Sequence, residues 1–230
     1  MSAPDEYGRL LSHLKDSFTS IYLTILSIIQ GVALTSLAVV VADGYRHFTP
    51  AQWALAALTF LILIIIWNHM TTDTLTWTWI PDFRDSAIPF LLGAFELYQA
   101  FAIAAGLGPW LFGMVAGAAL AVLEFFHVGR QVRLETPDAR MLRLFRRRSL
   151  SDLRQGIVGI GLFLVLGVAS VATGAAGTVL PWVAVLLTGL WLGAYALRTT
   201  LYWRALVRLA HNGRLPADTA LNRLVGLPLR

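Results

Sequence analysis

Six long apolar segments limit this chain to one class of fold. In the 230-residue sequence they lie at about residues 18–42, 51–70, 87–106, 110–128, 156–176 and 179–198. Each is long enough to cross a bilayer, since a helix needs about 20 apolar residues for roughly 30 Å of hydrocarbon. The composition agrees, because 57% of the residues are hydrophobic and 13% are charged, whereas soluble domains have about 45–50% and about 25%. We therefore predict an all-α, polytopic membrane helix bundle with six transmembrane helices. A soluble domain is excluded, and the absence of cysteine excludes a disulfide-stapled secreted module.

The basic residues are distributed very unevenly between the two sides of this bundle. With six spans, 17 of the 18 Lys and Arg residues fall on the side that holds both termini, and only Arg46 falls on the other. Cytoplasmic segments of membrane proteins carry such an excess of positive charge, so we predict that both termini are cytoplasmic. The net charge of +5 then reflects topology and attraction to an anionic inner leaflet. We expect no nucleic acid partner, and the plasma (inner) membrane of a prokaryote is the expected location.

The chain divides into a membrane domain and a basic tail. We predict that residues 1–200 form the six-span domain and that residues 201–230 form a helical tail on the inner leaflet. The loop 129–155 is basic, and we predict a short cytoplasmic helix in it that carries the three arginines at 146–148. Residues 106–109 contain two glycines and a proline, which predicts a tight turn between the third and fourth spans.

Polar side chains near the middle of the bilayer are candidates for function, because they are costly to place there. Gln30 lies about 12 residues into the first span and Glu96 about 10 residues into the third, counted from the same side. At 1.5 Å per residue these depths are roughly 18 and 15 Å, so we predict that the two side chains meet. Gln99 lies one turn beyond Glu96 on the same face. We predict that Glu96 binds a cation or a proton in a polar cavity open to the cytoplasm, with Gln30 and Gln99 as neighbours.

A second group of polar residues lies toward the cytoplasmic ends of the second and fourth spans. His69 and Asp73 are four residues apart, and Glu124 and His127 are three apart. Imidazole and carboxylate ligands suit a divalent metal, but the same groups also fit an ion-paired gate whose imidazoles charge between about pH 5 and 8. We prefer the gate and therefore expect no cofactor. The alternative is a divalent metal bound by these residues. The mouth of the cavity is assigned to four further residues: Asn68, Trp77, Trp79 and Asp85.

The fifth and sixth spans contain no acid and no histidine between residues 156 and 198. We therefore predict that they are structural and that the chain forms a homo-oligomer. Small residues let membrane helices approach closely, and Gly156, Gly159 and Gly167 are the predicted subunit contact.

These patterns favour a membrane transport protein, either an ion channel or a proton-coupled carrier of a small solute. Glu96 with Gln30 and Gln99, together with Glu124 and His127, would line the path. One alternative is a membrane-embedded, metal-dependent enzyme that uses the His69 group, although the balance is against an enzyme. The other alternative is a non-catalytic scaffold or regulatory subunit whose basic loop 129–155 docks a soluble partner.

Overall fold

The computed structural model describes residues 3–76, 83–135, 139–173 and 179–212 and is all-helical over those ranges, with no strand in them. It contains six helices: α1 (Ala3–Gly44), α2 (Pro50–Thr76), α3 (Phe83–Ala105), α4 (Leu107–Glu135), α5 (Ala139–Thr173) and α6 (Val179–Asn212). Each is long and apolar enough to cross a membrane. The prediction of six such helices is confirmed, and the fold is consistent with an integral membrane protein.

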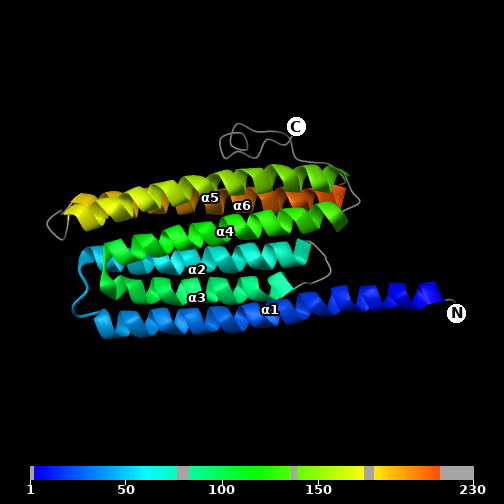
Figure 1. The fold of residues 1–230 in the computed structure, drawn as a ribbon, viewed down its shortest axis with the longest axis horizontal. Coiled ribbons are helices and arrows are strands. Elements are labelled where there is room, and N and C mark those ends of the chain that lie inside the picture. The colour runs from blue at the N-terminus through cyan, green and yellow to red at the C-terminus, as the bar shows by residue number, and fades with distance from the viewer. Residues whose placement is uncertain (1–2, 77–82, 136–138, 174–178, 213–230) are drawn as a thin grey trace.

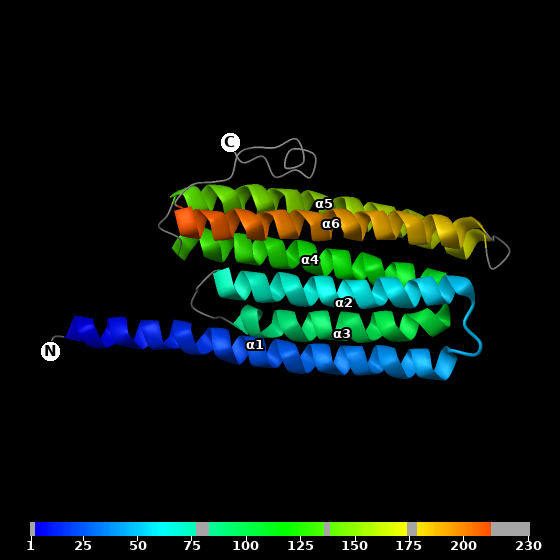
Figure 2. The same cartoon turned by 180° about the vertical axis from the view of Figure 1, so that it is seen from behind.

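The six helices run side by side along one long axis (Figures 1 and 2). α1 packs against α2 and α3, α4 packs against α3 and α5, and α6 packs against α2 and α5. The start of α1 and the end of α6 lie at the same end of the bundle, as an even number of spans requires, and α1 projects beyond the other helices there (Figure 1). We call this the terminal end.

Short-range chemistry explains how two of the helices begin. α2 starts with a capping box, in which the Gln52 backbone N–H donates to Thr49 Oγ1 at 3.3 Å and the Thr49 N–H donates to Gln52 Oε1 at 3.0 Å. Pro50 occupies the first position of that helix, where its missing N–H costs nothing. Gly106 alone separates α3 from α4, and its φ of 101° is readily adopted only by glycine. The predicted tight turn is confirmed.

α5 differs from the prediction. It is one helix of 35 residues that begins at Ala139, so the arginines at 146–148 lie in its first part and not in a separate cytoplasmic helix. Hydropathy alone places the start of this span near residue 156, because it treats every charge as exposed. The charges of Arg148 and Asp152 are instead buried against other helices, with exposed fractions of 2% each. Residues 142–155 are therefore continuous with the apolar helix that follows them.

The glycines of α5 pack against helices of the same chain. A Cβ atom on Gly156 would lie 2.6 Å from Val122 of α4, and one on Gly159 would lie 2.8 Å from Trp191 of α6. A Cβ on Gly167 would lie 3.3 Å from Phe112 of α4. These faces are therefore filled from within the chain, and the predicted subunit contact through them is wrong.

Candidate functional site

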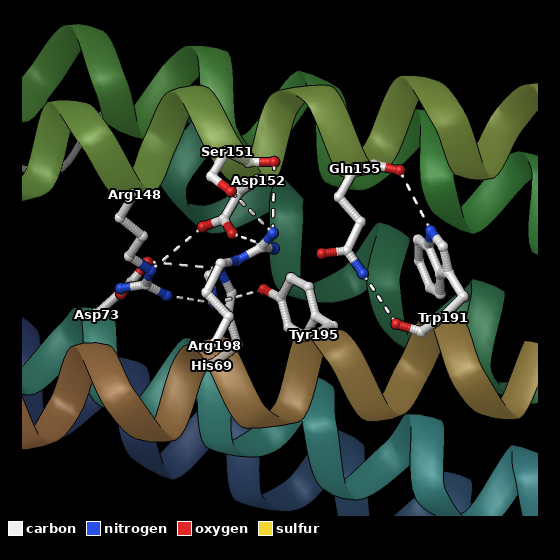
Figure 3. A network of polar contacts seen from close by, with 9 residues as sticks. All are labelled: His69, Asp73, Arg148, Ser151, Asp152, Gln155, Trp191, Tyr195 and Arg198. Carbon is white, nitrogen blue, oxygen red and sulfur yellow. Dashed lines mark hydrogen bonds and ion pairs between the residues drawn. The ribbon is translucent and has the colours of Figure 1, made fainter. Parts of the chain in front are cut away.

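A group of buried charged residues joins four helices near the terminal end of the bundle. We call it the ionic cluster, and it comprises His69 and Asp73 of α2, Glu124 of α4, Arg148 and Asp152 of α5, and Arg198 of α6. Every member is 6% exposed or less. Figure 3 shows all of these side chains except Glu124, converging from α2, α5 and α6. Charges this deeply buried are stable only when they are paired and hydrogen-bonded.

Arg148 is the centre of the cluster. Its Nη1 lies 2.5 Å from Asp73 Oδ1, and its Nε lies 3.2 Å from Asp152 Oδ2. The other oxygen of Asp152, Oδ1, lies 2.5 Å from Nη2 of Arg198. The guanidinium of Arg148 also lies over the ring of Tyr202, 4.2 Å from the centroid, a favourable cation–π arrangement. Two acids and two arginines thus alternate in a ladder that ties α2, α5 and α6 together.

The contacts of His69 determine where its ring carries a proton. Nη2 of Arg148 lies 2.6 Å from His69 Nδ1. A guanidinium has only donors and is not deprotonated in proteins, so Nδ1 must be the acceptor. The ring hydrogen is then on Nε2, which faces Asp73 Oδ2 at 3.4 Å and Glu124 Oε1 at 3.6 Å. At these distances Nε2 has no hydrogen-bond partner among the described residues, so His69 directs an unsatisfied donor toward two carboxylates.

The ionic cluster does not balance its own charge. It holds three carboxylates and two guanidinium groups, and the described contacts of Arg148 and Arg198 with acids all go to Asp73 and Asp152. Glu124 pairs within the described chain with His69 alone, which is neutral when Nδ1 accepts from Arg148. With all three acids ionised, the cluster carries one excess negative charge, and Glu124 is the group without a cationic partner.

A cavity lies beside the cluster, between α2, α3, α4, α5 and α6, with about 710 Å³ of empty space that includes space open to the surface. Most of its wall is apolar, including Ile62, Leu92 and Met114. Its polar groups come mainly from the cluster and the adjoining turns of α5 and α6: His69, Glu124, Asp152, Gln155 and Tyr195. Gln155 donates from Nε2 to the Trp191 carbonyl at 2.9 Å (Figure 3), and this bond joins α5 to α6 along the wall. The cavity is thus an apolar chamber with charged groups gathered on one part of its surface.

Three of the residues predicted for the gate come together here. His69 and Asp73 of α2 meet Glu124 of α4. His127 lies instead along a groove of about 790 Å³ between α3 and α4, whose wall also includes Leu92, Glu124 and Arg130. Among the described residues no group of three or more His, Cys, Asp or Glu is arranged to hold a metal ion.

The predicted contact between Gln30 and Glu96 is confirmed. Gln30 Nε2 donates to Glu96 Oε1 at 2.5 Å, and this bond joins α1 to α3. Glu96 is fully buried, but it does not line the 710 Å³ cavity. Gln99 is also fully buried, against the position of Gly113, and its amide has no hydrogen-bond partner in the described part of the chain.

Of the four residues predicted for the cavity mouth, Asn68 is the one whose side chain the structure describes. Asn68 is exposed, although its neighbour His69 is buried. Trp77 and Trp79 lie outside the described residues, and so does the side chain of Asp85.

Sequence reasoning missed the contribution of α5 and α6. Hydropathy places Arg148 and Asp152 in a cytoplasmic loop and Arg198 at the edge of the last span. The sixth helix also supplies Tyr195, whose hydroxyl lies 2.9 Å from His69 Nδ1. Comparison of the chain with models of known families, with curated proteins and with solved structures found no match.

Proposed function

We propose that this protein is a proton-coupled carrier of the membrane, in which Glu124 binds the proton and the cavity of about 710 Å³ binds the solute. The observation that carries the proposal is the single excess negative charge of the ionic cluster. A buried, uncompensated charge costs several kcal/mol, and the cost falls when a proton neutralises it.

Glu124 is the group in the cluster best placed to take up that proton. Asp73 and Asp152 each lie 2.5 Å from a guanidinium nitrogen, so protonating either of them would leave an arginine without its partner. Within the described residues, the one ion pair of Glu124 is with the His69 ring, at 3.6 Å. A proton on Glu124 makes the cluster neutral and leaves the ladder of Asp73, Arg148, Asp152 and Arg198 intact.

The position of Glu124 links the proton to the solute. Its carboxyl group belongs both to the ionic cluster and to the wall of the cavity. If protonation of Glu124 changes the affinity of the cavity for a solute, binding of that solute changes the affinity of Glu124 for the proton by the same factor, because binding linkage is reciprocal. Such mutual dependence is what coupled transport requires.

The expected orientation places the cluster near the cytoplasm. The ionic cluster lies toward the terminal end of the bundle, the end to which the positive-inside rule assigns the cytoplasm. We propose that the protein occupies a prokaryotic plasma (inner) membrane and exchanges its proton with the cytoplasmic side in the state described here.

The proposal is tested on purified protein by two measurements. Infrared difference spectra between acid and alkaline pH are expected to contain a carboxylic acid carbonyl band that is lost in Glu124→Gln and retained in Asp43→Asn. Asp43 is an exposed acid near the opposite end of the bundle and is the matched control. Potentiometric titration is expected to show that Glu124→Gln takes up one proton fewer than the wild type between alkaline and acid pH. A spectrum without a Glu124 band, together with equal proton uptake in the two proteins, contradicts the proposal.

A further inference from the structure

We infer that the solute is a monovalent organic cation with an apolar, aromatic body, and that it exchanges with the proton on Glu124. This inference rests on the proposed function and names its substrate class. It is argued from three features of the cavity: its wall, the sign of its charges, and the arrangement of groups around Glu124.

The wall of the cavity fits an apolar and largely aromatic body. Four aromatic side chains line it: Phe95, Phe125, Trp191 and Tyr195. Aromatic faces attract cations, most strongly where water is excluded. The wall therefore favours a cation that carries apolar groups over a small hydrated ion.

The charged groups that line the cavity are acidic. Glu124 and Asp152 form part of its wall, whereas Arg148 and Arg198 do not. Both guanidinium groups are turned toward the acids of the ladder. An anionic solute would therefore meet carboxylates, and a neutral solute would leave the excess charge of the cluster uncompensated. A monovalent cation cancels that charge.

The surroundings of Glu124 allow one positive charge at a time. α2 directs His69 and Asp73 toward it, and α5 directs Arg148 and Asp152 into the same cluster. α6 contributes Tyr195, and α3 contributes the apolar Leu92 and Phe95. α4 itself carries His127 and Arg130 further along the groove that Glu124 also lines, and no ion pair joins either of them to Glu124 among the described residues. One added charge neutralises the cluster, and a second would leave it positive and buried. When the cation binds, Glu124 releases its proton to water and its carboxylate pairs with the cation, so one cation exchanges for one proton.

The experiment compares two probes of nearly the same shape and opposite charge. Purified protein in detergent is titrated with tetraphenylphosphonium and with tetraphenylborate, and binding is followed by quenching of tryptophan fluorescence and by calorimetry. We expect saturable binding of the phosphonium and none of the borate. In the pH range where Glu124 is protonated, the affinity for the phosphonium is expected to fall about tenfold for each unit by which the pH is lowered, since one proton competes with one cation. In weakly buffered solution each bound cation is expected to release one proton, which a pH dye records.

Three variants locate the site. Glu124→Gln is expected to weaken phosphonium binding by about 30-fold or more, as loss of a buried charged partner does. Glu124→Asp keeps the charge and is expected to retain pH-dependent binding, and Asp43→Asn is expected to bind as the wild type does. Size-exclusion profiles check that each variant is folded. The proton-release measurement uses only the wild type, so it decides the question even if Glu124→Gln does not fold.

The possible failures are distinguishable. Borate binding as tight as phosphonium binding, phosphonium binding that is unchanged in Glu124→Gln, or no saturable phosphonium binding each overturns the cation inference. If the infrared band of Glu124 is present in that case, the proposed proton coupling stands and the solute belongs to another class. If the phosphonium binds through Glu124 without releasing a proton, the cation site stands and the proton coupling fails.

Discussion

Replacing Arg148 with glutamine is the most direct test of how the bundle holds its buried charges. In the wild type, Arg148 contacts Asp73 at 2.5 Å, Asp152 at 3.2 Å and His69 at 2.6 Å. Glutamine keeps a polar side chain but removes the positive charge, so the cluster would go from one excess negative charge to two. Arg198 would remain the one guanidinium paired with Asp152, and Asp73 would lose its cationic partner.

The expected loss of stability follows from the burial of the pair. Removing one partner of a buried ion pair costs about 3–5 kcal/mol, and the exposed fractions of 2% for Arg148 and 6% for Asp73 place this pair in that class. For chains of about 150–250 residues, 1 kcal/mol lowers the melting temperature by about 2–4 °C. We therefore expect Arg148→Gln to melt about 6–20 °C below the wild type. Adding Asp73→Asn removes the stranded acid and is expected to recover part of the loss, with a coupling energy of about 0.5–3 kcal/mol.

The assay is thermal unfolding in detergent, followed by the fluorescence of the 8 tryptophans. Arg146→Gln is the matched control, because Arg146 lies on the same helix, two residues away, and is exposed. It is expected to melt within about 2 °C of the wild type, as exposed substitutions change the free energy of unfolding little. If Arg148→Gln melts as high as Arg146→Gln, the ladder does not stabilise the bundle and our reading of the cluster is refuted.

Three further predictions concern topology, packing and the Gln30 contact partner. The chain has no cysteine, so a membrane-impermeant maleimide is expected to label Asp43→Cys on intact cells and His211→Cys only after permeabilisation; the reverse pattern would invert the bundle. Gly159→Leu is expected to lower the free energy of unfolding by about 1–3 kcal/mol, because its Cβ would lie 2.8 Å from an indole ring, without changing oligomer size. Gly161→Leu is the control, because a Cβ atom on Gly161 would have no neighbouring atom within 4 Å among the described residues, and it is expected to leave the melting temperature unchanged. Glu96→Gln is expected to bind tetraphenylphosphonium as the wild type does, since Glu96 does not line the cavity, and a loss of binding in calorimetry would return Glu96 to the solute path.

Depth along a span was enough to predict one long-range contact. Gln30 and Glu96 lie at similar depths on two spans that leave the same side of the membrane, and each is a polar group in an apolar segment. Because lipid offers neither of them a partner, pairing is the arrangement that satisfies both, and the hydrogen bond between them is present. Depth on the span likewise predicts that His69, Asp73 and Glu124 meet, and these side chains converge in the structure.

Hydropathy alone does not find the contribution of α5 and α6 to the cluster. α5 begins at Ala139, whereas hydropathy places the start of the span near residue 156 because of the charges between these two points. A signal was nevertheless present in the sequence. Asp152 is the only acid between residues 139 and 217, and it lies four residues after Arg148, on the same face of a helix. An isolated acid among arginines at the edge of an apolar segment is a candidate for a buried pair.

The excess charge of the cluster is a property of four helices together. Arg148 and Asp152 form a neutral pair within α5, and adding Asp73 from α2 and Arg198 from α6 leaves the sum at zero. Only when α4 adds Glu124 does the cluster become negative, and Glu124 is also the acid that the cavity shares with the groove between α3 and α4. A hydropathy scale assigns each residue type a fixed cost of burial and therefore cannot find this group. The cost of burying Glu124 depends on the two arginines, which already pair with Asp73 and Asp152. Counting charges and partners over the assembled cluster identifies Glu124 as the acid whose protonation neutralises the cluster without leaving an arginine unpaired, and that acid faces the cavity.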